Sequence, residues 1–98
     1  MAKQLIVVAE MKAKAGLEGM LKAEAQAMLA PTRSEEGCIQ YDLHEADSEP
    51  GRILFYEIWA SNAAWQAHMQ QPHLIRFLSG FGEWLDEPAR VHTYAKLA

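Results

Sequence analysis

The sequence has little cysteine, little positive charge and no long apolar run. Its 98 residues include one cysteine, Cys38, which cannot form a disulfide within the chain and therefore favours a reducing, cytoplasmic location. Lysine and arginine number 9 against 13 aspartate and glutamate residues, so the formal charge is −4. This balance argues against a nucleic-acid partner, because binding to phosphates requires a basic patch.

The apolar runs and the glycines exclude further classes of protein. The first apolar run, residues 5–9, ends at Glu10. An export signal has a longer apolar core, and a membrane span needs about 20 residues. We therefore expect no export signal and no membrane partner. The 6 glycines form no GxGxxG, P-loop or GxSxG pattern, so no nucleotide, flavin or nicotinamide cofactor is expected.

The chain does contain enough apolar material for one small core. Hydrophobic residues make up 50% of it and charged residues 22%. A chain of this length buries roughly two-thirds of the surface that its unfolded form exposes. That suffices for one domain and not for two, so we expect residues 1–98 to form a single domain.

Hydrophobic periodicity predicts a mixture of strands and helices. Apolar residues alternate in some segments and recur at i, i+3 and i+4 in others. The predicted strands cover residues 5–12, 38–46, 52–60 and 91–97, and the predicted helices cover residues 17–29, 63–69 and 72–81. Pro31 should disturb or end the first helix, Ser61 suits the N-cap of the second, and Pro72 suits the start of the third. This order predicts an α+β, ferredoxin-like split βαβ fold with a four-stranded antiparallel sheet.

Two of the predicted strands, 5–12 and 52–60, are apolar on both faces. The helices of this fold cover only one face of the sheet, so the apolar residues of the other face need a different cover. A second copy of the same sheet is the simplest one, and twofold dimers are the commonest assemblies. We therefore predict a homodimer in which two sheets pack face to face.

Strand 52–60 carries the most informative polar residue. Glu57 lies on one face with Phe55 and Trp59, and a buried carboxylate must be paired or protonated. It either makes a structural hydrogen bond or points into a pocket. Trp59 is either a core residue or the wall of a pocket for a flat ligand. The same space could be lined by Trp65, Met69, Phe77 and Phe81. Such a stripe is more often core than site.

The four histidines are His44, His68, His73 and His92. His68 and His73 are five residues apart with Pro72 between them, whereas two metal-binding histidines of one helix lie at i and i+4. No metal site is therefore expected. His44 and His92 fit ordinary surface or hydrogen-bonded histidines. For His68 and His73, which lie beside the aromatic segment, a structural role and a role in a site are both open.

Four short blocks occur together along the chain. They are Glu36-Gly37-Cys38-Ile39-Gln40-Tyr41, Phe55-Tyr56-Glu57-Ile58-Trp59, Trp65-Gln66-Ala67-His68-Met69 and Pro72-His73-Leu74. In order and spacing they resemble the antibiotic biosynthesis monooxygenase domain, most of all its small stand-alone members such as the quinol monooxygenase. The resemblance implies a dimeric α+β barrel with one pocket per subunit between sheet and helices. It also implies oxidation of phenols or hydroquinones by O₂ without flavin, haem or metal.

The resemblance further implies a base in the pocket. His68 and His73 match the histidines of the family's helix block, so one of them would act as a base or a hydrogen-bond partner. Glu57 could orient that histidine. An electron-rich phenolate or hydroquinone anion can reduce O₂ itself, so the protein would bind the ring, assist its deprotonation and exclude water.

The walls of the implied pocket are aromatic. Trp59 matches the strand-end tryptophan of the family pocket, and Trp65 falls where some members place another aromatic residue. Tyr41 would add a hydroxyl group if Ile39, Tyr41 and Leu43 share the face of Trp59. The register of the hairpin decides that question.

Other functions stay open beside the monooxygenase. Haem-degrading relatives carry an asparagine late in the first strand, where this chain has Glu10-Met11-Lys12. A branch that acts on a phosphorylated sugar would need clustered basic residues, and only Arg76 and the histidines lie near the candidate pocket. The alternatives are a non-catalytic dimer that binds a small molecule, an isomerase of a small oxygenated metabolite, and a haem-binding relative.

Overall fold

The structure is a computed structural model that describes residues 3–98. Its strands are β1 (Leu5–Lys12), β2 (Cys38–Glu45), β3 (Arg52–Trp59) and β4 (Arg90–Tyr94). Its helices are α1 (Glu18–Gln26), α2 (Leu29–Arg33), α3 (Asn62–His68), α4 (Pro72–Ser79) and α5 (Phe81–Trp84). The predicted order of elements is confirmed, with α2 and α5 as additional short helices.

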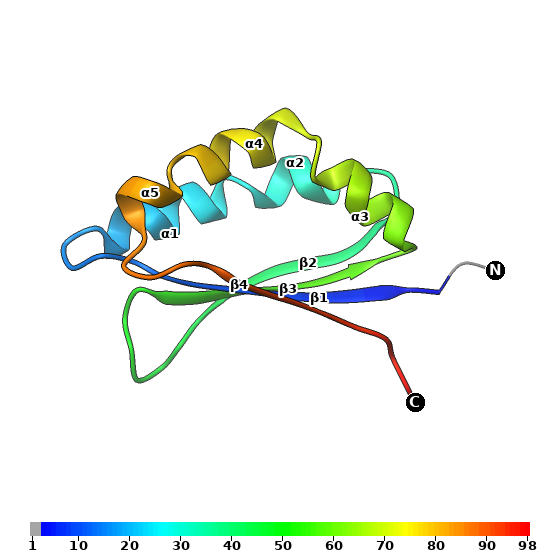
Figure 1. Ribbon diagram of the computed structural model, residues 1–98, viewed down its shortest axis with the longest axis horizontal. Helices are drawn as coiled ribbons and strands as arrows, with labels where there is room; N and C mark the ends of the chain where they lie inside the picture. Colours follow the sequence, from blue (N-terminus) through cyan, green and yellow to red (C-terminus); the bar gives the residue numbers. More distant parts are fainter. Residues whose placement is uncertain (1–2) are drawn as a thin grey trace.

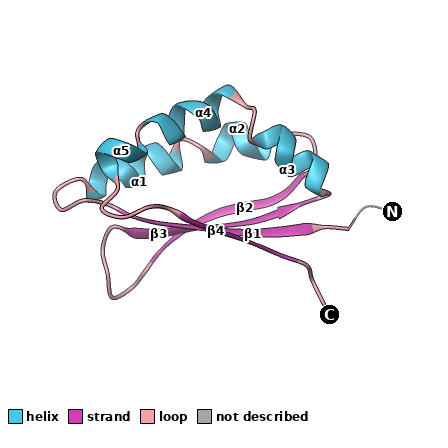
Figure 2. Cartoon of the chain, viewed as in Figure 1, coloured by secondary structure: helices cyan, strands magenta, loops and turns pink. Residues whose placement is uncertain are grey.

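The strands form one antiparallel sheet in the order β2-β3-β1-β4. All the helices lie on the same side of this sheet, and the other side carries none (Figure 1). Figure 2 shows the resulting two layers, helices above and strands below. This is the α+β ferredoxin-like arrangement that the sequence predicts. No helix within residues 3–98 is long and apolar enough to cross a membrane.

The core lies between the two layers. The strand faces that point to the helices bury Val7 and Met11 of β1 together with Phe55 and Trp59 of β3, as their alternation predicts. The helices contribute the buried residues Leu21, Ala25, Leu74 and Phe77. Each fully buried large side chain of this kind stabilises the fold by about 1.5–3 kcal/mol. The inner face of the sheet is therefore the surface on which any enclosed site must be built.

The helix predicted over residues 17–29 is two helices in the structure. α1 ends at Gln26, and Pro31 lies inside α2 rather than after a single helix. A proline removes the hydrogen bond to the carbonyl four residues earlier, and its ring crowds that carbonyl. The residue in question is Ala27, the C-cap of α1. Pro31 thus ends the first helix one turn before its own position.

The start of β2 departs from strict alternation. Cys38 pairs with Trp59 and Gln40 pairs with Ile58, so Ile39 is an extra residue in this strand. Ile39 is 52% exposed, so it does not share the inner face with Tyr41 as strict alternation would require. Cys38 instead packs against the core. The alternation recovers after the bulge, and Tyr41 lies on the inner face.

The C-terminal third follows the prediction with shifted ends. Ser61 caps α3 by accepting a hydrogen bond from the Ala64 amide at 3.1 Å, and Pro72 begins α4, both as expected. The predicted helix over 72–81 ends at Ser79, and residue 81 begins α5. Gly80 lies between the two helices. The ring of Trp84 occupies the space that a side chain at this position would need. β4 ends at Tyr94, before the predicted residue 97.

Gly37 is the position where the backbone most clearly requires glycine. Its φ is +85°, and a Cβ atom there would lie 2.5 Å from the Cβ of Ala64 on α3. The Gly37 carbonyl also accepts a hydrogen bond from the Ala60 amide at 2.8 Å. The turn before β2 can therefore lie against α3 only without a side chain at residue 37. This close contact brings Glu35, two residues earlier, next to the helix layer.

We expect Gly37→Ala to lower the free energy of unfolding by about 2 kcal/mol or more, because the new methyl group meets both an unfavourable φ and the Ala64 side chain. Urea unfolding followed by circular dichroism measures the change. Gly19→Ala in α1 is the matched control, since nothing lies within 4 Å of a Cβ atom there. It should stabilise the helix by up to about 1 kcal/mol. Equal stabilities of the two variants would contradict this account.

Candidate functional site

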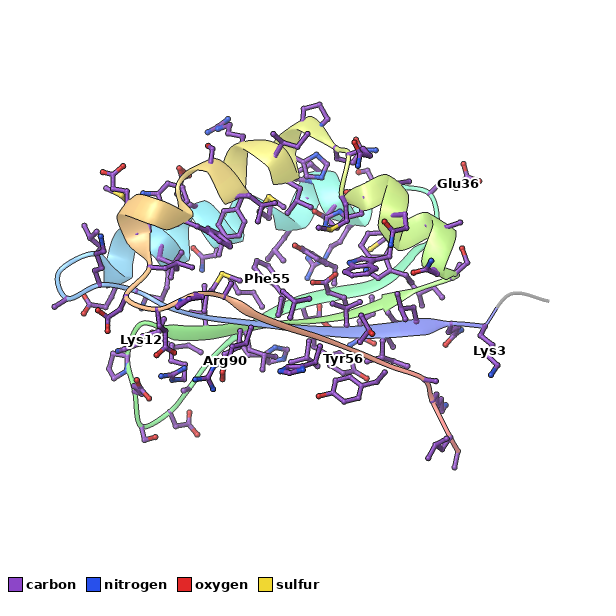
Figure 3. All side chains as sticks on the ribbon, viewed as in Figure 1. Lys3, Lys12, Glu36, Phe55, Tyr56 and Arg90 are labelled. Carbon is purple, nitrogen blue, oxygen red and sulfur yellow. The ribbon has the colours of Figure 1, made fainter. Side chains whose placement is uncertain are left out.

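A small cavity of about 70 Å³ lies between the inner face of the sheet and the helices α3 and α4. Figure 3 shows Phe55, one of its lining residues, on the helix side of the sheet, and Tyr56 on the opposite side. The apolar lining comes from Val7, Ala9, Met11, Phe55, Trp65, Met69, Leu74, Phe77, Leu78, Phe81, Ala89 and Val91. The polar lining residues are Tyr41, Glu57 and His68. An apolar cavity with a few convergent polar groups is typical of a site for a small organic molecule.

Glu57 lies in the middle of β3, between Val7 of β1 and Tyr41 of β2. It is 4% exposed, and its Oε1 accepts a hydrogen bond from the indole Nε1 of Trp59 at 2.9 Å. Burial raises the pKa of Glu57 to about 7; the hydrogen bond from Trp59 opposes this rise and the charge of Glu35 adds to it. This carboxyl group therefore exchanges a proton near neutral pH, as general acids and bases do.

Tyr41 enters the cavity from β2, beside Glu57. Its ring stacks on Phe55, with ring centres 4.9 Å apart, and meets the ring of His68 edge-on at 5.8 Å. Burial raises the pKa of Tyr41 well above its ordinary value, and the Glu57 charge acts in the same direction. The side chain is thus a neutral phenol held against two other polar groups.

His68 is the last residue of α3 and is almost fully buried. Its Nδ1 lies 2.8 Å from Oε2 of Glu35, and its ring lies 4.7 Å from that of Trp59. Burial lowers the pKa of His68, although the hydrogen bond and the charge of Glu35 oppose this. A neutral imidazole beside a carboxylate donates its Nδ1–H, which leaves the lone pair on Nε2. The hydrogen bond to Glu35 thus fixes the orientation of the His68 ring and leaves Nε2 as a hydrogen-bond acceptor.

The free nitrogen of His68 remains accessible. Nε2 has no hydrogen-bond partner within residues 3–98, and Thr32 Oγ1 is the one fully enclosed side-chain polar atom of these residues that lacks a partner. Nε2 is therefore not sealed in the core. His68 is one of the residues that line the cavity, and its Nε2 is free to accept a hydrogen bond.

Glu35 is the residue that the sequence did not reveal. It lies in the turn between α2 and β2, and its Oε2 contacts both His68 Nδ1 at 2.8 Å and His73 Nε2 at 2.7 Å. The expectation that Glu57 orients a histidine is wrong, because Glu57 is bonded to Trp59 and Glu35 takes this role. Two successive acids in a turn were its only signal, and a turn has no periodicity from which burial follows.

The same three side chains bring together donor atoms of the kinds that bind metal ions. The donor atoms of Glu35, His68 and His73 lie within 4.8 Å of one another, and the histidines belong to different helices. Both ring nitrogens, however, contact one carboxylate oxygen at hydrogen-bond distance. An ion between them would replace these contacts by bonds of about 2.0–2.1 Å to nitrogen atoms without protons. The described geometry fits a hydrogen-bonded bridge.

The structure brings most of the candidate residues to one cavity. Those that line it are Tyr41, Glu57, Trp65, His68, Met69, Phe77 and Phe81. Trp59 does not line it. This side chain is fully buried and donates a hydrogen bond to Glu57, so it is a core residue and not a pocket wall. His73 lies outside it as well, beside a second small cavity next to Arg76, and reaches His68 only through Glu35.

The volume of the cavity limits what it can hold. An engineered cavity of about 150 Å³ is known to bind benzene, and the cavity here has about half that volume. A ring would therefore either protrude from the mouth or displace a flexible lining side chain such as Met69. A porphyrin is far larger than this space, so the cavity does not fit haem.

The chain belongs to the antibiotic biosynthesis monooxygenase family, whose sequence model matches residues 4–79. The solved structure of PA3566 from Pseudomonas aeruginosa is similar along all of the chain, with 32% identity, a TM-score of 0.94 and coverage of 100% of this chain and 98% of that one. The structure of Rv0793 from Mycobacterium tuberculosis has 32% identity and a TM-score of 0.92, and covers 97% of this chain and 96% of that one.

Two curated relatives add names and lengths. The Mycobacterium tuberculosis protein is named "Putative monooxygenase Rv0793", and the alignment covers 99% of this chain and 95% of that protein. A protein of Synechocystis named "Uncharacterized protein sll1783" is 32% identical over 92% of this chain, but the chain spans only 61% of its length. Family membership and the name of the Mycobacterium tuberculosis relative support a monooxygenase-like function.

Glu57 should make the protein less stable as the pH rises. Its folded-state pKa of about 7 lies above the ordinary 4.5, so the folded state binds this proton more tightly than the unfolded state does. The resulting stabilisation is fully present below the ordinary value and is lost as the pH rises through about 7. It amounts to about 3 kcal/mol. Relative to the original chain, Glu57→Gln should therefore gain stability between about pH 5 and pH 8.

Urea unfolding of both proteins at the two pH values measures this difference. Neutral His68 is present in both, so its own loss of stability in acid cancels in the comparison. Glu36→Gln, which changes an exposed carboxylate in the turn before β2, is the control and should follow the original chain at both pH values. A constant difference between Glu57→Gln and the original chain would show that Glu57 is ionised throughout this range.

Proposed function

We propose that this chain is a monooxygenase that oxidises a small electron-rich aromatic molecule, such as a hydroquinone or phenol, with O₂ and without a cofactor. The observation that carries the proposal is the arrangement of His68, a neutral imidazole that is held by Glu35 through Nδ1, keeps Nε2 free and lines an apolar cavity. Membership of the family and the name of the Mycobacterium tuberculosis relative support the reaction class.

The reaction would start with a proton transfer. The ring hydroxyl of the bound molecule gives its proton to His68 Nε2, and the resulting anion is electron-rich enough to reduce O₂. The substrate supplies all the electrons: one oxygen atom enters the ring, the other leaves as water, and a hydroquinone ends as a hydroxyquinone. Apolar walls keep bulk water away from the reduced oxygen species.

The other polar residues of the cavity would hold the second side of the ring. Glu57, with a pKa of about 7, can accept a hydrogen bond from a second hydroxyl group when ionised or donate one to a quinone oxygen when protonated. Tyr41 stays a neutral donor because burial raises its pKa. Trp65 and Phe77 offer flat apolar contacts on the helix side.

A second candidate function uses the same residues without O₂. A neutral base, His68, and a carboxyl group with a pKa of about 7, Glu57, line one cavity. Such a pair can remove a proton from one atom of a small oxygenated metabolite and return a proton to another, which is an isomerisation. The small volume of the cavity favours a molecule of this size. Deuterium uptake from solvent without oxygen consumption would favour this candidate.

We expect oxygen uptake with a panel of hydroquinones and naphthols, and we expect His68→Asn to lower kcat/KM by about 100-fold or more because the base is lost. An oxygen electrode and metal-free buffers are sufficient for the measurement. His44→Asn is the matched control, since His44 pairs opposite Leu54 on the other face of the sheet. No uptake by the original chain across the panel would overturn the monooxygenase, and an unchanged rate in His68→Asn would overturn the assignment of the base.

We further propose that the chain works as a homodimer in the cytoplasm. The outer face of the sheet carries apolar side chains that no helix covers (Figure 1). They are Ile6, Val8, Leu54, Tyr56, Ile58 and Tyr94. Figure 3 shows Tyr56 pointing away from the helix layer. A second copy of this face would cover them. The single thiol, Cys38, fits a reducing compartment.

A charge in the middle of the outer face should separate the subunits. Sedimentation equilibrium should give twice the chain mass for the original protein and a dissociation constant raised by about 100-fold or more for Ile58→Lys, because a desolvated hot-spot position would carry an unpaired charge. Ile75→Lys on α4 is the control, since Ile75 is 53% exposed on the helix side. A monomeric original chain, or equal effects of the two substitutions, would contradict a dimer through this face.

A further inference from the structure

One carboxylate oxygen links two imidazoles that lie at different depths in the protein. Oε2 of Glu35 lies 2.8 Å from Nδ1 of His68 and 2.7 Å from Nε2 of His73. The side chains are 8% exposed for Glu35, 3% for His68 and 22% for His73. The cluster thus runs from the cavity, which His68 lines, to His73 nearer the surface of the helix layer.

A single buried carboxylate can compensate one positive charge well and two poorly. The ring centres of His68 and His73 are 6.1 Å apart, so two imidazolium ions would repel each other across the same oxygen. The charge of His73 lowers the proton affinity of His68, and that of Glu35 raises it. A positive charge on His73 therefore opposes the protonation of His68.

We propose that Glu35 is the residue that positions the base, His68, and that His73 compensates the charge that His68 gains. The cluster then carries one positive charge, which is on either His73 or His68. When His68 Nε2 takes a proton from the bound molecule, the charged His73 gives its Nδ1 proton to water. The carboxylate of Glu35 stays ionised, and the charge of the buried cluster does not change. No electron moves in this step. The role of His68 as the base rests on the proposed function.

Other charged and titratable groups also face the cluster. Tyr41 and Glu57 approach His68 from the sheet, while Arg76 and Glu24 lie beside His73 in the second cavity. Burial raises the pKa of Cys38, and the charge of the nearby Glu35 adds to this rise. None of these groups is hydrogen-bonded to Glu35, whereas both histidines are. The coupling should therefore belong to the bridge itself.

The test is a titration of the histidine ring protons followed by nuclear magnetic resonance in the full chain. His73→Gln keeps a hydrogen-bond donor for Glu35 but removes the second positive charge, and it should raise the proton affinity of His68 by roughly tenfold. Glu35→Gln should lower that affinity, and also lower kcat/KM by about 100-fold with its pH profile displaced. His44→Gln, on the outer face, should leave the titration of His68 unchanged.

The outcomes separate this inference from the proposed function. Coupling of the two histidines without any oxygen uptake would sustain the bridge and overturn the monooxygenase. Oxygen uptake together with a His68 titration that neither His73→Gln nor Glu35→Gln changes would overturn the proposed bridge. The proposed monooxygenase function would then still stand. Because His73 is partly exposed, the His73→Gln arm remains decisive even where Glu35→Gln does not fold. Purified protein with one transition-metal ion held by these three side chains would overturn the bridge as well.

Discussion

The hydrogen bonds of one buried carboxylate connect the parts of the molecule that form the cavity. Glu35 belongs to the turn between α2 and β2, and through one oxygen it binds the last residue of α3 and the second residue of α4. α3 and α4 contribute most of the helix side of the cavity. A charge at this depth is tolerable only because it is paired on the spot. The position of His68, the spacing of the two helices and the burial of the turn therefore depend on the same interaction.

This interaction depends in turn on close packing of the backbone. Gly37 lets the turn approach Ala64 of α3, and Ala64 donates to Ser61, the N-cap that starts the helix. His68 then lies one turn of helix after Ala64, so that its ring reaches Glu35 on one side and the cavity on the other. Small residues at the contact and a serine at the cap thus set the depth at which the imidazole is held.

The sequence predicts the sheet better than it predicts the site. The faces of β1 and β3 follow from alternation, because each apolar residue of a half-buried strand has to point the same way as its second neighbour. The same reasoning places Glu57 in the core. An acid on an otherwise apolar strand face indicated that a cavity could lie there. Glu35 could not be placed in this way, since a turn has no period, and its partners lie 33 and 38 residues further along the chain. Local patterns also could not show that Ile39 is an extra residue in β2.

The two faces of the sheet differ in what covers them, because all the helices lie on the inner side. Val7 and Phe55 on the inner face line the cavity, whereas Ile6 and Tyr56 on the outer face lie away from it. A second copy on the outer face would therefore stabilise the sheet without filling or covering the cavity. Val91 on the edge strand β4 also lines the cavity, and it is 51% exposed in the single chain. Apolar surface buried on the outer face by a second copy would offset the apolar contacts that are missing around the cavity. The fold would then not require side chains to fill the cavity.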